Sequence, residues 1–458
     1  MSAPALPHPA ATPPGPRGYP IVGVLPQLRS NPIRTFLDAA DRYGDIVHLK
    51  AGPYHGYLLS DPAHIRHVLQ DNARNYHKSP LYDRLRDSLG NGLLTSEDSL
   101  WLRQRRLAQP AFHRQRLVAM ADAMVAGTGQ MLERWEGTAA RGDAIDVVAE
   151  MMSLTQAIIV RTMFSTDLGT TAEIVNRTWP IINQRIGETF WSTKLETTLP
   201  LPANIRFRRA LRELEAVVYR IIAERRQTNR DEPDLLSMFL SARDEETGEG
   251  MTDRHLRDEV MTMLLAGHET TSLALSWTYY LLSQHPEAER RIADEVDAVI
   301  GDMRPAFAHL EGLRYTRMAL EESLRLYPPA WGFSRLALDA DEIGGYRIAK
   351  GSLAFVIPFV VHRRPKLWPD PERFDPERFS PGREAARPRF AYIPFGGGPR
   401  GCIGNQFAMV EAQLIVASIA QRYRIELAPD QTIRADPLIT LRPKPGIRAT
   451  LAKRVRRG

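Results

Sequence analysis

The most informative segment of this chain is Phe395-Gly-Gly-Gly-Pro-Arg-Gly-Cys402-Ile-Gly404. Five of the residues between 396 and 404 are glycines, which relax the limits on φ and ψ and let the backbone approach another group closely. A helical pattern follows over residues 405–422. Cys402, the single cysteine among 458 residues, is therefore predicted at a helix N-terminus, where orphan N–H groups and the dipole stabilise a thiolate. This arrangement favours a soft metal centre with one protein ligand; the alternative is a glycine-rich turn with an incidental cysteine.

A second segment, Leu265-Ala-Gly-His-Glu-Thr-Thr271, lies in the middle of a predicted helix over residues 252–285 that stops before a proline. Residues 260–266 are apolar on every side of this helix, which predicts burial. Gly267 costs the helix about 1 kcal/mol relative to alanine, so we expect it to make room for something. Glu269 and Thr270 place an acid and a hydroxyl beside this stretch, where a carboxylate needs a partner. A plain hydrogen bond from Thr270 to a preceding carbonyl is the alternative.

Two weaker patterns bring charged side chains onto one helix face. Glu322 and Arg325 are an i,i+3 pair just before a Pro-Pro turn, and alone they would be a surface pair worth little. Arg378, in Phe374-Asp-Pro-Glu-Arg-Phe379, could complete a charge triad with them. Trp101 and Arg105, at i,i+4, could grip a carboxylate, with an amphipathic helix bearing a solvated basic face as the alternative.

The remaining patterns indicate a mostly helical chain with a small antiparallel β portion. Strand patterns at residues 46–49 and 57–60 predict a hairpin through Gly52-Pro53. A similar pattern returns at 346–348 and 353–357 around Lys350-Gly351, and helical patterns dominate residues 100–327.

Composition excludes several classes of protein. Apolar residues make up 43% and charged residues 25%, which excludes a disordered or collagen-like chain. Sixty basic minus 54 acidic side chains gives +6, which favours a local basic docking face and no binding of nucleic acid. No run approaches the roughly 18 apolar residues of a membrane span, so we expect a cytoplasmic protein with no membrane anchor. The lone cysteine excludes an intramolecular disulfide.

Together the four motifs resemble the cytochrome P-450 family of heme-thiolate monooxygenases, in the same order along the chain. The match runs from Pro13 to the strands near Leu451. The resemblance implies a mainly α fold with small β-sheets, arranged as a single triangular heme domain over residues 13–458. Residues 1–12 would be a flexible Pro-rich tail. The implied cofactor is heme b.

The resemblance also implies a role for individual residues. Cys402 would be the axial thiolate, and Phe395 would pack near it. Glu269 and Thr270 would be the acid–alcohol pair that delivers protons during oxygen activation. Glu322, Arg325 and Arg378 would form a structural triad that holds the heme-binding core. The implied partners of the heme propionates are Trp101, Arg105, Arg335 and Arg400.

The expected substrate is a hydrophobic small molecule, such as a terpenoid, a fatty acid or a polyketide-like compound, into which one oxygen atom from O2 is inserted. Expected pocket residues are Leu265, Ala266, Trp331 and Phe333, with Phe190, Trp191 and residues 439–440 nearby. Electrons would come from an acidic ferredoxin or flavodoxin with its reductase. Residues 101–116, with five arginines and no acid, and residues 380–400 would form the basic docking face.

Two other readings keep the heme-thiolate fold. One is a peroxide-driven or oxidative-coupling enzyme, against which the intact Glu269-Thr270 pair argues. The other is a non-catalytic heme sensor, which would have no open distal pocket.

Overall fold

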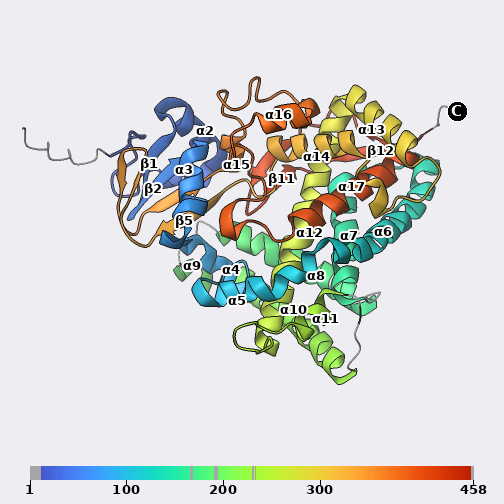
Figure 1. Cartoon of the computed structure of the whole chain (residues 1–458), viewed down its shortest axis with the longest axis horizontal. Helices are drawn as coiled ribbons and strands as arrows, with labels where there is room; N and C mark the ends of the chain where they lie inside the picture. The colour runs from blue at the N-terminus through green and yellow to red at the C-terminus, as the bar shows by residue number, and fades with distance from the viewer. Residues whose placement is uncertain (1–11, 166–168, 190–193, 229–231, 233, 455–458) are drawn as a thin grey trace, which may run out of the picture. The chain divides into compact units, whose positions relative to one another are not determined.

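A computed structural model describes residues 12–165, 169–189, 194–228, 232 and 234–454 (Figure 1). The predicted tail, residue 12 apart, lies outside the described residues, as do Phe190 and Trp191. The chain forms two compact units. The sheet unit comprises the described residues up to Tyr82 together with 330–373 and 381–402. The helical unit comprises residues 83–329, 374–380 and those from 403 onward.

The sheet unit is built on a five-stranded sheet in the order β1-β2-β8-β5-β3 (Figure 1). Its strands are β1 (Ile46–Ala51), β2 (Tyr54–Leu59), β3 (Tyr76–Lys78), β5 (Phe333–Ala337) and β8 (Leu353–Val356). The first hairpin prediction is confirmed, because β1 and β2 pair antiparallel with Ile46 opposite Leu59. β8 pairs parallel with β2 and antiparallel with β5, so it is a central strand.

The second hairpin prediction is wrong. β7 (Tyr346–Ile348) pairs with β6 (Asp341–Ile343) across Gly344 and Gly345, and β8 joins the larger sheet instead. Both glycines have positive φ, as a two-residue hairpin turn requires. All four residues of β8 are buried, which suits a strand covered on both faces. The turn at Lys350-Gly351 shows where the chain bends but not which strand it joins.

The sheet unit also contains short helices. They are α1 (Leu25–Ser30), α2 (Pro32–Tyr43), α3 (Pro62–Arg66), α15 (Pro358–Val361), α16 (Pro381–Ala385), η1 (His67–Asp71), η2 (Ala73–Asn75), η3 (Pro80–Tyr82) and η7 (Gly398–Arg400). Phe36 of α2 packs its ring against Phe355 of β8 and against Trp331, so α2 closes over the apolar face of the strands.

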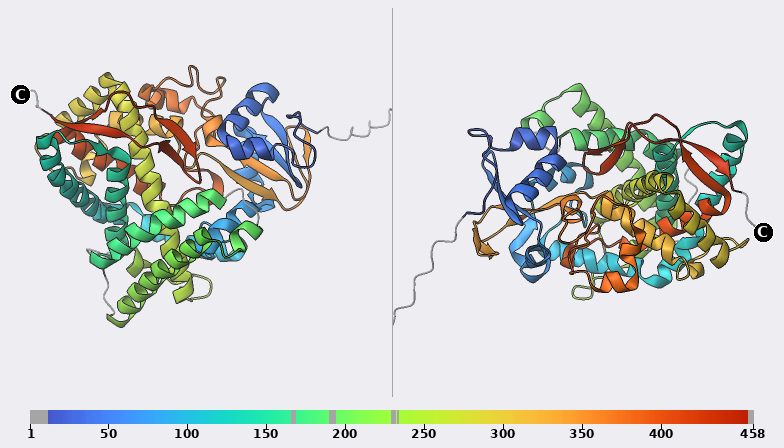
Figure 2. Two further views of the ribbon diagram at one scale, coloured as in Figure 1. Left: turned by 180° about the vertical axis from the view of Figure 1, so that it is seen from behind. Right: turned by 90° about the horizontal axis from the view of Figure 1, so that it is seen from above.

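The helical unit contains a second, larger set of α-helices (Figures 1 and 2). They are α4 (Asp83–Leu89), α5 (Asp98–Ala108), α6 (Arg114–Arg141), α7 (Val147–Phe164), α8 (Gly169–Thr189), α9 (Lys194–Thr198), α10 (Pro202–Thr228), α11 (Leu235–Ser241), α12 (Asp253–Gln284), α13 (Pro286–Val299), α14 (Arg314–Leu326) and α17 (Asn405–Arg422). Short helical turns are η4 (Gln109–Phe112), η5 (Phe307–His309) and η6 (Pro376–Phe379).

Two small sheets complete this unit. One has the order β4-β12-β9, made of β4 (Ile145–Asp146), β12 (Arg448–Lys453) and β9 (Tyr423–Leu427). The other is the antiparallel hairpin of β10 (Arg434–Pro437) and β11 (Leu441–Lys444). This hairpin is fixed to α12, because the Trp277 Nε1–H donates to the Leu441 carbonyl at 2.9 Å.

The predicted bounds of α12 are confirmed. Thr252 caps its N-terminus by accepting a hydrogen bond from the His255 N–H, and Pro286 follows its C-cap. It packs along α7 (Figure 2). At Gly267 a Cβ atom would lie 2.7 Å from Cδ1 of Ile159 in α7, so the glycine makes room for this helix crossing. The predicted burial of residues 260–266 holds except at Ala266, which is exposed.

One helix among the described residues, α7, is long and apolar enough to cross a membrane by length and composition alone. Of its 18 residues, 56% are buried inside the protein, the pattern of a core helix packed against neighbours such as α12.

Candidate functional site

Cys402 lies in the glycine-rich loop of residues 395–404, here called the cysteine loop. The thiol-bearing residue is exposed, and its N–H donates to the Phe395 carbonyl at 2.9 Å, which closes the loop on itself. Gly398 has φ of +67°, and a Cβ there would lie 1.8 Å from the Leu69 carbonyl oxygen. The loop therefore needs glycine to pass η1. Cys402 comes two residues before Gly404, the N-cap of α17, so it lies just outside the predicted helix N-terminus.

In the helical unit, the middle of α12 has one accessible face. Ala266 is exposed and Thr270 half-buried, one turn apart, whereas Leu265, Glu269 and Thr271 are buried. The Thr270 hydroxyl donates to the Ala266 carbonyl at 2.7 Å, the plain hydrogen bond expected as the alternative. Thr270 thus holds its hydroxyl on the accessible face, where its oxygen can still accept a hydrogen bond.

Glu269 points away from that face into a buried polar cluster. Its exposed fraction is 1%, and its Oε1 accepts from the Thr440 hydroxyl at 2.6 Å and from Arg442 Nε at 3.0 Å. Arg442 Nη2 donates to the same oxygen, and the Asn183 side chain of α8 donates to Oε2. The structure therefore joins the acid to the β10–β11 hairpin and not to Thr270. Sequence reasoning missed Arg442 and Asn183, and named Thr440 only as a pocket position.

The predicted charge triad comes together within the helical unit. Arg325 grips Glu322 through Nε at 2.7 Å and Nη2 at 2.8 Å, and both side chains are 0% exposed. Arg378 of η6 lies 3.3 Å from Glu322 Oε1, and the Asp375 N–H donates to that oxygen at 2.9 Å. The pair is thus a buried ion pair, whose charges must stay matched.

The expected propionate partners occur in both units. Trp101 and Arg105 are half-buried on α5 in the helical unit. Arg335 of β5 is buried, with Nη1 donating to the Ser334 carbonyl at 3.1 Å and its guanidinium over the Phe333 ring at 5.1 Å. Arg400 is half-buried at the end of η7.

Of the expected pocket residues, Leu265 is buried, Ala266 is exposed and Phe333 is half-buried. Trp331 is buried with its ring 6.5 Å from that of Phe36, which is a packing contact of the sheet unit.

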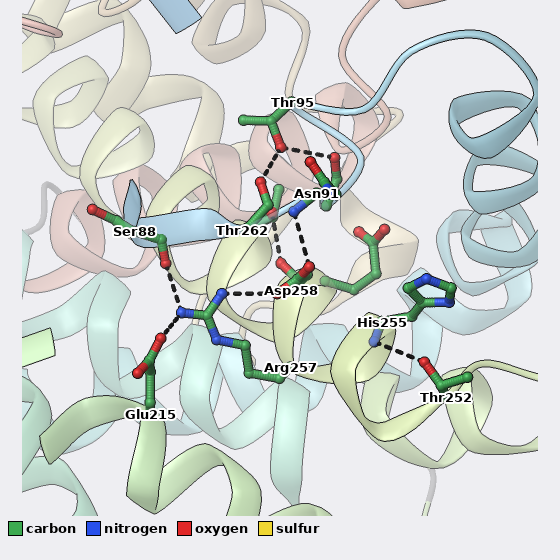
Figure 3. Close-up of polar contacts among 12 residues, drawn as sticks. Ser88, Asn91, Thr95, Glu215, Thr252, His255, Arg257, Asp258 and Thr262 are labelled. Carbon is green, nitrogen blue, oxygen red and sulfur yellow. Dashed lines mark hydrogen bonds and ion pairs between the residues drawn. The ribbon is translucent and has the colours of Figure 1, made fainter. Parts of the chain in front are cut away.

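A second polar cluster joins α12 to the segment 88–95 (Figure 3). Asp258 accepts from the Asn91 N–H at 2.9 Å and from Arg257 at 2.8 Å. Arg257 also donates to the Ser88 carbonyl and pairs with Glu215 of α10. Ser88 lies in α4, so the helices α4, α10 and α12 and the loop after α4 meet at one ion cluster.

Glycines allow this segment to lie directly on α12. A Cβ at Gly90 would be 2.2 Å from the Asp258 carboxylate, and one at Gly92 would be 2.2 Å from the Thr262 hydroxyl. The next acid, Glu259, accepts from the Leu93 N–H at 3.2 Å, while its Oε1 has no hydrogen-bond partner among the described residues. Burial, with a further contribution from the charge of Asp258, raises the pKa of Glu259 to about 8.

Comparison with known proteins shows which family has this sequence and fold. The family model described as Cytochrome P450 matches residues 13–449. The chain belongs to the cytochrome P450 family. This P450 is 40% identical over 430 residues to cyclooctatin synthase of Streptomyces melanosporofaciens, covering 93% of this chain and 92% of that protein. It is 37% identical to cyclooctat-9-en-7-ol 5-monooxygenase of the same organism, covering 94% of this chain and 92% of that one.

Two further similarities agree. Pentalenene oxygenase of Streptomyces avermitilis is 36% identical over 437 residues, covering 94% of this chain and 95% of its own. The crystal structure of the cytochrome P450DA heme domain superposes with a TM-score of 0.89 at 27% identity, covering 98% of this chain and 99% of that one. The expected fold, mainly α with small β-sheets, is confirmed. This P450 is a heme-iron monooxygenase that uses O2, a hydrophobic substrate and a redox partner.

The residues present fit a heme. Cysteine is usually a buried residue, yet the lone thiol of this chain is exposed on a glycine loop. The face of α12 at Ala266 and Thr270 is accessible in the middle of a helix that is otherwise buried there. A cysteine thiolate is one of the protein ligands that hold heme iron.

We predict that Glu259→Gln flattens the pH dependence of stability. In the unfolded chain this carboxyl titrates near 4.3, whereas in the folded protein its pKa is about 8. Between these values the folded state holds a proton that the unfolded state has lost. The free energy of unfolding therefore falls as the pH rises from 5 to 8, by a few kcal/mol. Thermal unfolding at pH 5, 6, 7 and 8 measures it.

The control is Glu133→Gln, which neutralises an exposed glutamate of α6. Its unfolding curve should follow that of the wild type at every pH. Parallel pH profiles for the wild type and Glu259→Gln would contradict the prediction.

We predict that Glu322→Gln lowers the free energy of unfolding by about 3–5 kcal/mol, because it leaves the buried Arg325 without a counter-charge. Arg317→Gln on the same helix breaks an i,i+4 pair with Glu321 whose arginine is 57% exposed, and should cost less than about 1 kcal/mol. Urea unfolding compares the two, and equal losses would show that the triad is not a buried ion pair in solution.

Proposed function

We propose that this P450 oxygenates a polycyclic terpenoid. The observation that carries this proposal is the shared chemistry of the named relatives, which act on cyclooctat-9-en-7-ol and on pentalenene at 37% and 36% identity to this chain. The two names denote an alcohol and an alkene, and neither indicates a charged group. An apolar substrate of this kind suits the side chains at Leu265, Ala266 and Phe333, which offer no charge for a fatty-acid carboxylate.

In this proposal Cys402 would hold the iron of heme b through its thiolate, and Phe395 would pack near that sulfur and help to set its electron density. Thiolate-bound heme supplies the reductive activation of O2 and the insertion of one oxygen atom into the substrate. The propionates would be bound by Trp101 and Arg105 of α5, by Arg335 and by Arg400, since charge-assisted hydrogen bonds hold carboxylates firmly. Residues 13–458 act as one heme domain, and Glu322, Arg325 and Arg378 hold its core.

The overall reaction consumes one substrate C–H bond, one O2, two electrons and two protons, and gives the alcohol and one water. Both protons must reach a buried oxygen. Thr270 is the residue proposed to deliver these protons. Its hydroxyl lies on the accessible face of α12 and can hold a water molecule there. Glu269, its neighbour in sequence, is proposed to relay the protons. If delivery fails, the same electrons and protons leave as hydrogen peroxide.

The proposed redox partner is an acidic ferredoxin or flavodoxin, and the proposed location is the cytoplasm. Support comes from the net charge of +6 and from Arg383 and Arg389, which are exposed in the segment 380–400. The arginines of residues 101–116 contribute less than expected. Three of the five, Arg103, Arg106 and Arg114, form ion pairs with acids of the helical unit.

We predict that cyclooctat-9-en-7-ol or pentalenene shifts the heme absorption of the purified protein from low to high spin with micromolar affinity. Dodecanoic acid, an apolar probe with a carboxylate, should bind at least tenfold more weakly. When the protein is supplied with O2 and electrons, turnover of the ligand that binds more tightly should give a product heavier by one oxygen atom. Tighter binding of dodecanoic acid than of both terpenoids would overturn the proposed substrate class.

We predict that Thr270→Ala uncouples the enzyme. With the ligand that binds in the spin-shift assay, NADPH consumption should continue while product per NADPH falls at least fivefold and hydrogen peroxide rises to match. Thr278→Ala is the matched control, because Thr278 makes the same hydrogen bond to the carbonyl four residues earlier, at 2.7 Å. Equal coupling in the two variants would refute the proton-delivery role of Thr270.

A further inference from the structure

The side chains that hold Glu269 come from outside its own helix. Asn183 belongs to α8, Thr440 lies in the turn of the β10–β11 hairpin, and Arg442 lies in β11. Three donors converge on Oε1 alone: the Thr440 hydroxyl and two nitrogens of one guanidinium. Asn183 donates to the other oxygen, Oε2, so the donors on both oxygens together fix the position and the rotation of the carboxylate, and the guanidinium supplies the charge-assisted bonds.

We propose that Arg442 is a positioning residue for oxygen activation, which holds the Glu269 carboxylate in the place from which it supplies protons. This inference rests on the proposed proton-delivery role of Glu269. It also assigns a task to the β10–β11 hairpin, which carries the counter-charge of an acid that lies on α12.

The hairpin is built to hold Arg442 in place. β11 is anchored next to this arginine at Leu441, whose carbonyl accepts from Trp277 Nε1 at 2.9 Å and whose N–H donates to the Pro329 carbonyl at 2.9 Å. Trp277 itself lies stacked on Tyr327 with ring centroids 4.0 Å apart. The backbone beside Arg442 is therefore fixed to the same helix that bears Glu269, two turns further along.

Arg442 is also the member of the cluster that reaches solvent. Its side chain is 29% exposed, whereas the Glu269 side chain is 1% exposed, and Asn183 and Thr440 are buried. Water bound at the guanidinium can exchange with bulk solvent, while the carboxylate stays desolvated. Removing the guanidinium leaves a buried carboxylate with neutral donors only, which it tolerates poorly. The carboxylate must then move, take up a proton or admit water, and each change alters proton supply.

The test uses the heme-loaded full chain and four variants: Arg442→Gln, Arg442→Lys, Glu269→Gln and the double variant Glu269→Gln/Arg442→Gln. The matched control is Arg434→Gln, which removes an exposed arginine from β10 of the same hairpin. Cyclooctat-9-en-7-ol or pentalenene, whichever gives the spin shift, is the substrate probe, with NADPH and a surrogate ferredoxin–reductase pair as electron source.

The first readout is urea unfolding, which needs no turnover. We expect Arg442→Gln to lower the unfolding midpoint strongly in the wild-type background and at least threefold less in the Glu269→Gln background. Arg434→Gln should have only a small effect on the midpoint. Additive midpoint shifts for the Arg442 and Glu269 substitutions would show that the ion pair is absent in solution and would overturn the inference.

The second readout is product formed per NADPH consumed. We expect Arg442→Gln to lower this ratio at least threefold and raise hydrogen peroxide, Arg442→Lys to restore half or more of it, and Arg434→Gln to leave it unchanged. A merely structural role of Arg442 would change stability without changing the ratio, and that result overturns the inference. If Glu269→Gln itself stays coupled, the proposed proton role of Glu269 fails; if it uncouples and Arg442→Gln does not, only the positioning role fails.

Discussion

Desolvated carboxylates on α12 organise the helical unit. A helix that crosses a protein core must bury nearly every side chain, and an ionised acid in such a place is tolerated only with a counter-charge or hydrogen-bond donors. Asp258 obtains these from Arg257 and from the segment 88–95, and Glu269 obtains them from Asn183 and the β10–β11 hairpin. Each buried acid thereby fixes a distant stretch of chain to the central helix. The elements that surround the proposed site are held by charge as well as by apolar packing.

The sequence predicted those parts of the fold that depend on neighbours along the chain. Thr252 and Pro286 are local start and stop signals, so the bounds of α12 could be predicted within a residue or two. Glu322 and Arg325 could be paired because i,i+3 spacing brings two residues of one helix together. The motifs also predicted the P-450 family, which the comparisons show, and the heme-site residues that they imply stay predictions.

What could not be predicted depends on contacts between segments far apart in sequence. Nothing near Arg442 indicates that it faces Glu269, 173 residues earlier in the chain. The patterns at 346–348 and 353–357 gave strands but not partners, because alternation describes one strand and not its register with another. The Gly-Gly pair at 344–345 was the available hairpin signal. Gly267 was expected to make room for something, and only packing shows that this is Ile159 of α7.

The close approach of segment 90–95 to α12 has a consequence for attempts to change which molecules this protein accepts. Gly90 and Gly92 leave no room for a single methyl group before Asp258 and Thr262. Two backbone amides of the same segment, those of Asn91 and Leu93, end on buried acids. Libraries that randomise this stretch as an ordinary surface loop would mostly return unfolded protein. Folded variants there require positions 258, 259 and 262 of α12 to be varied in the same library as the loop.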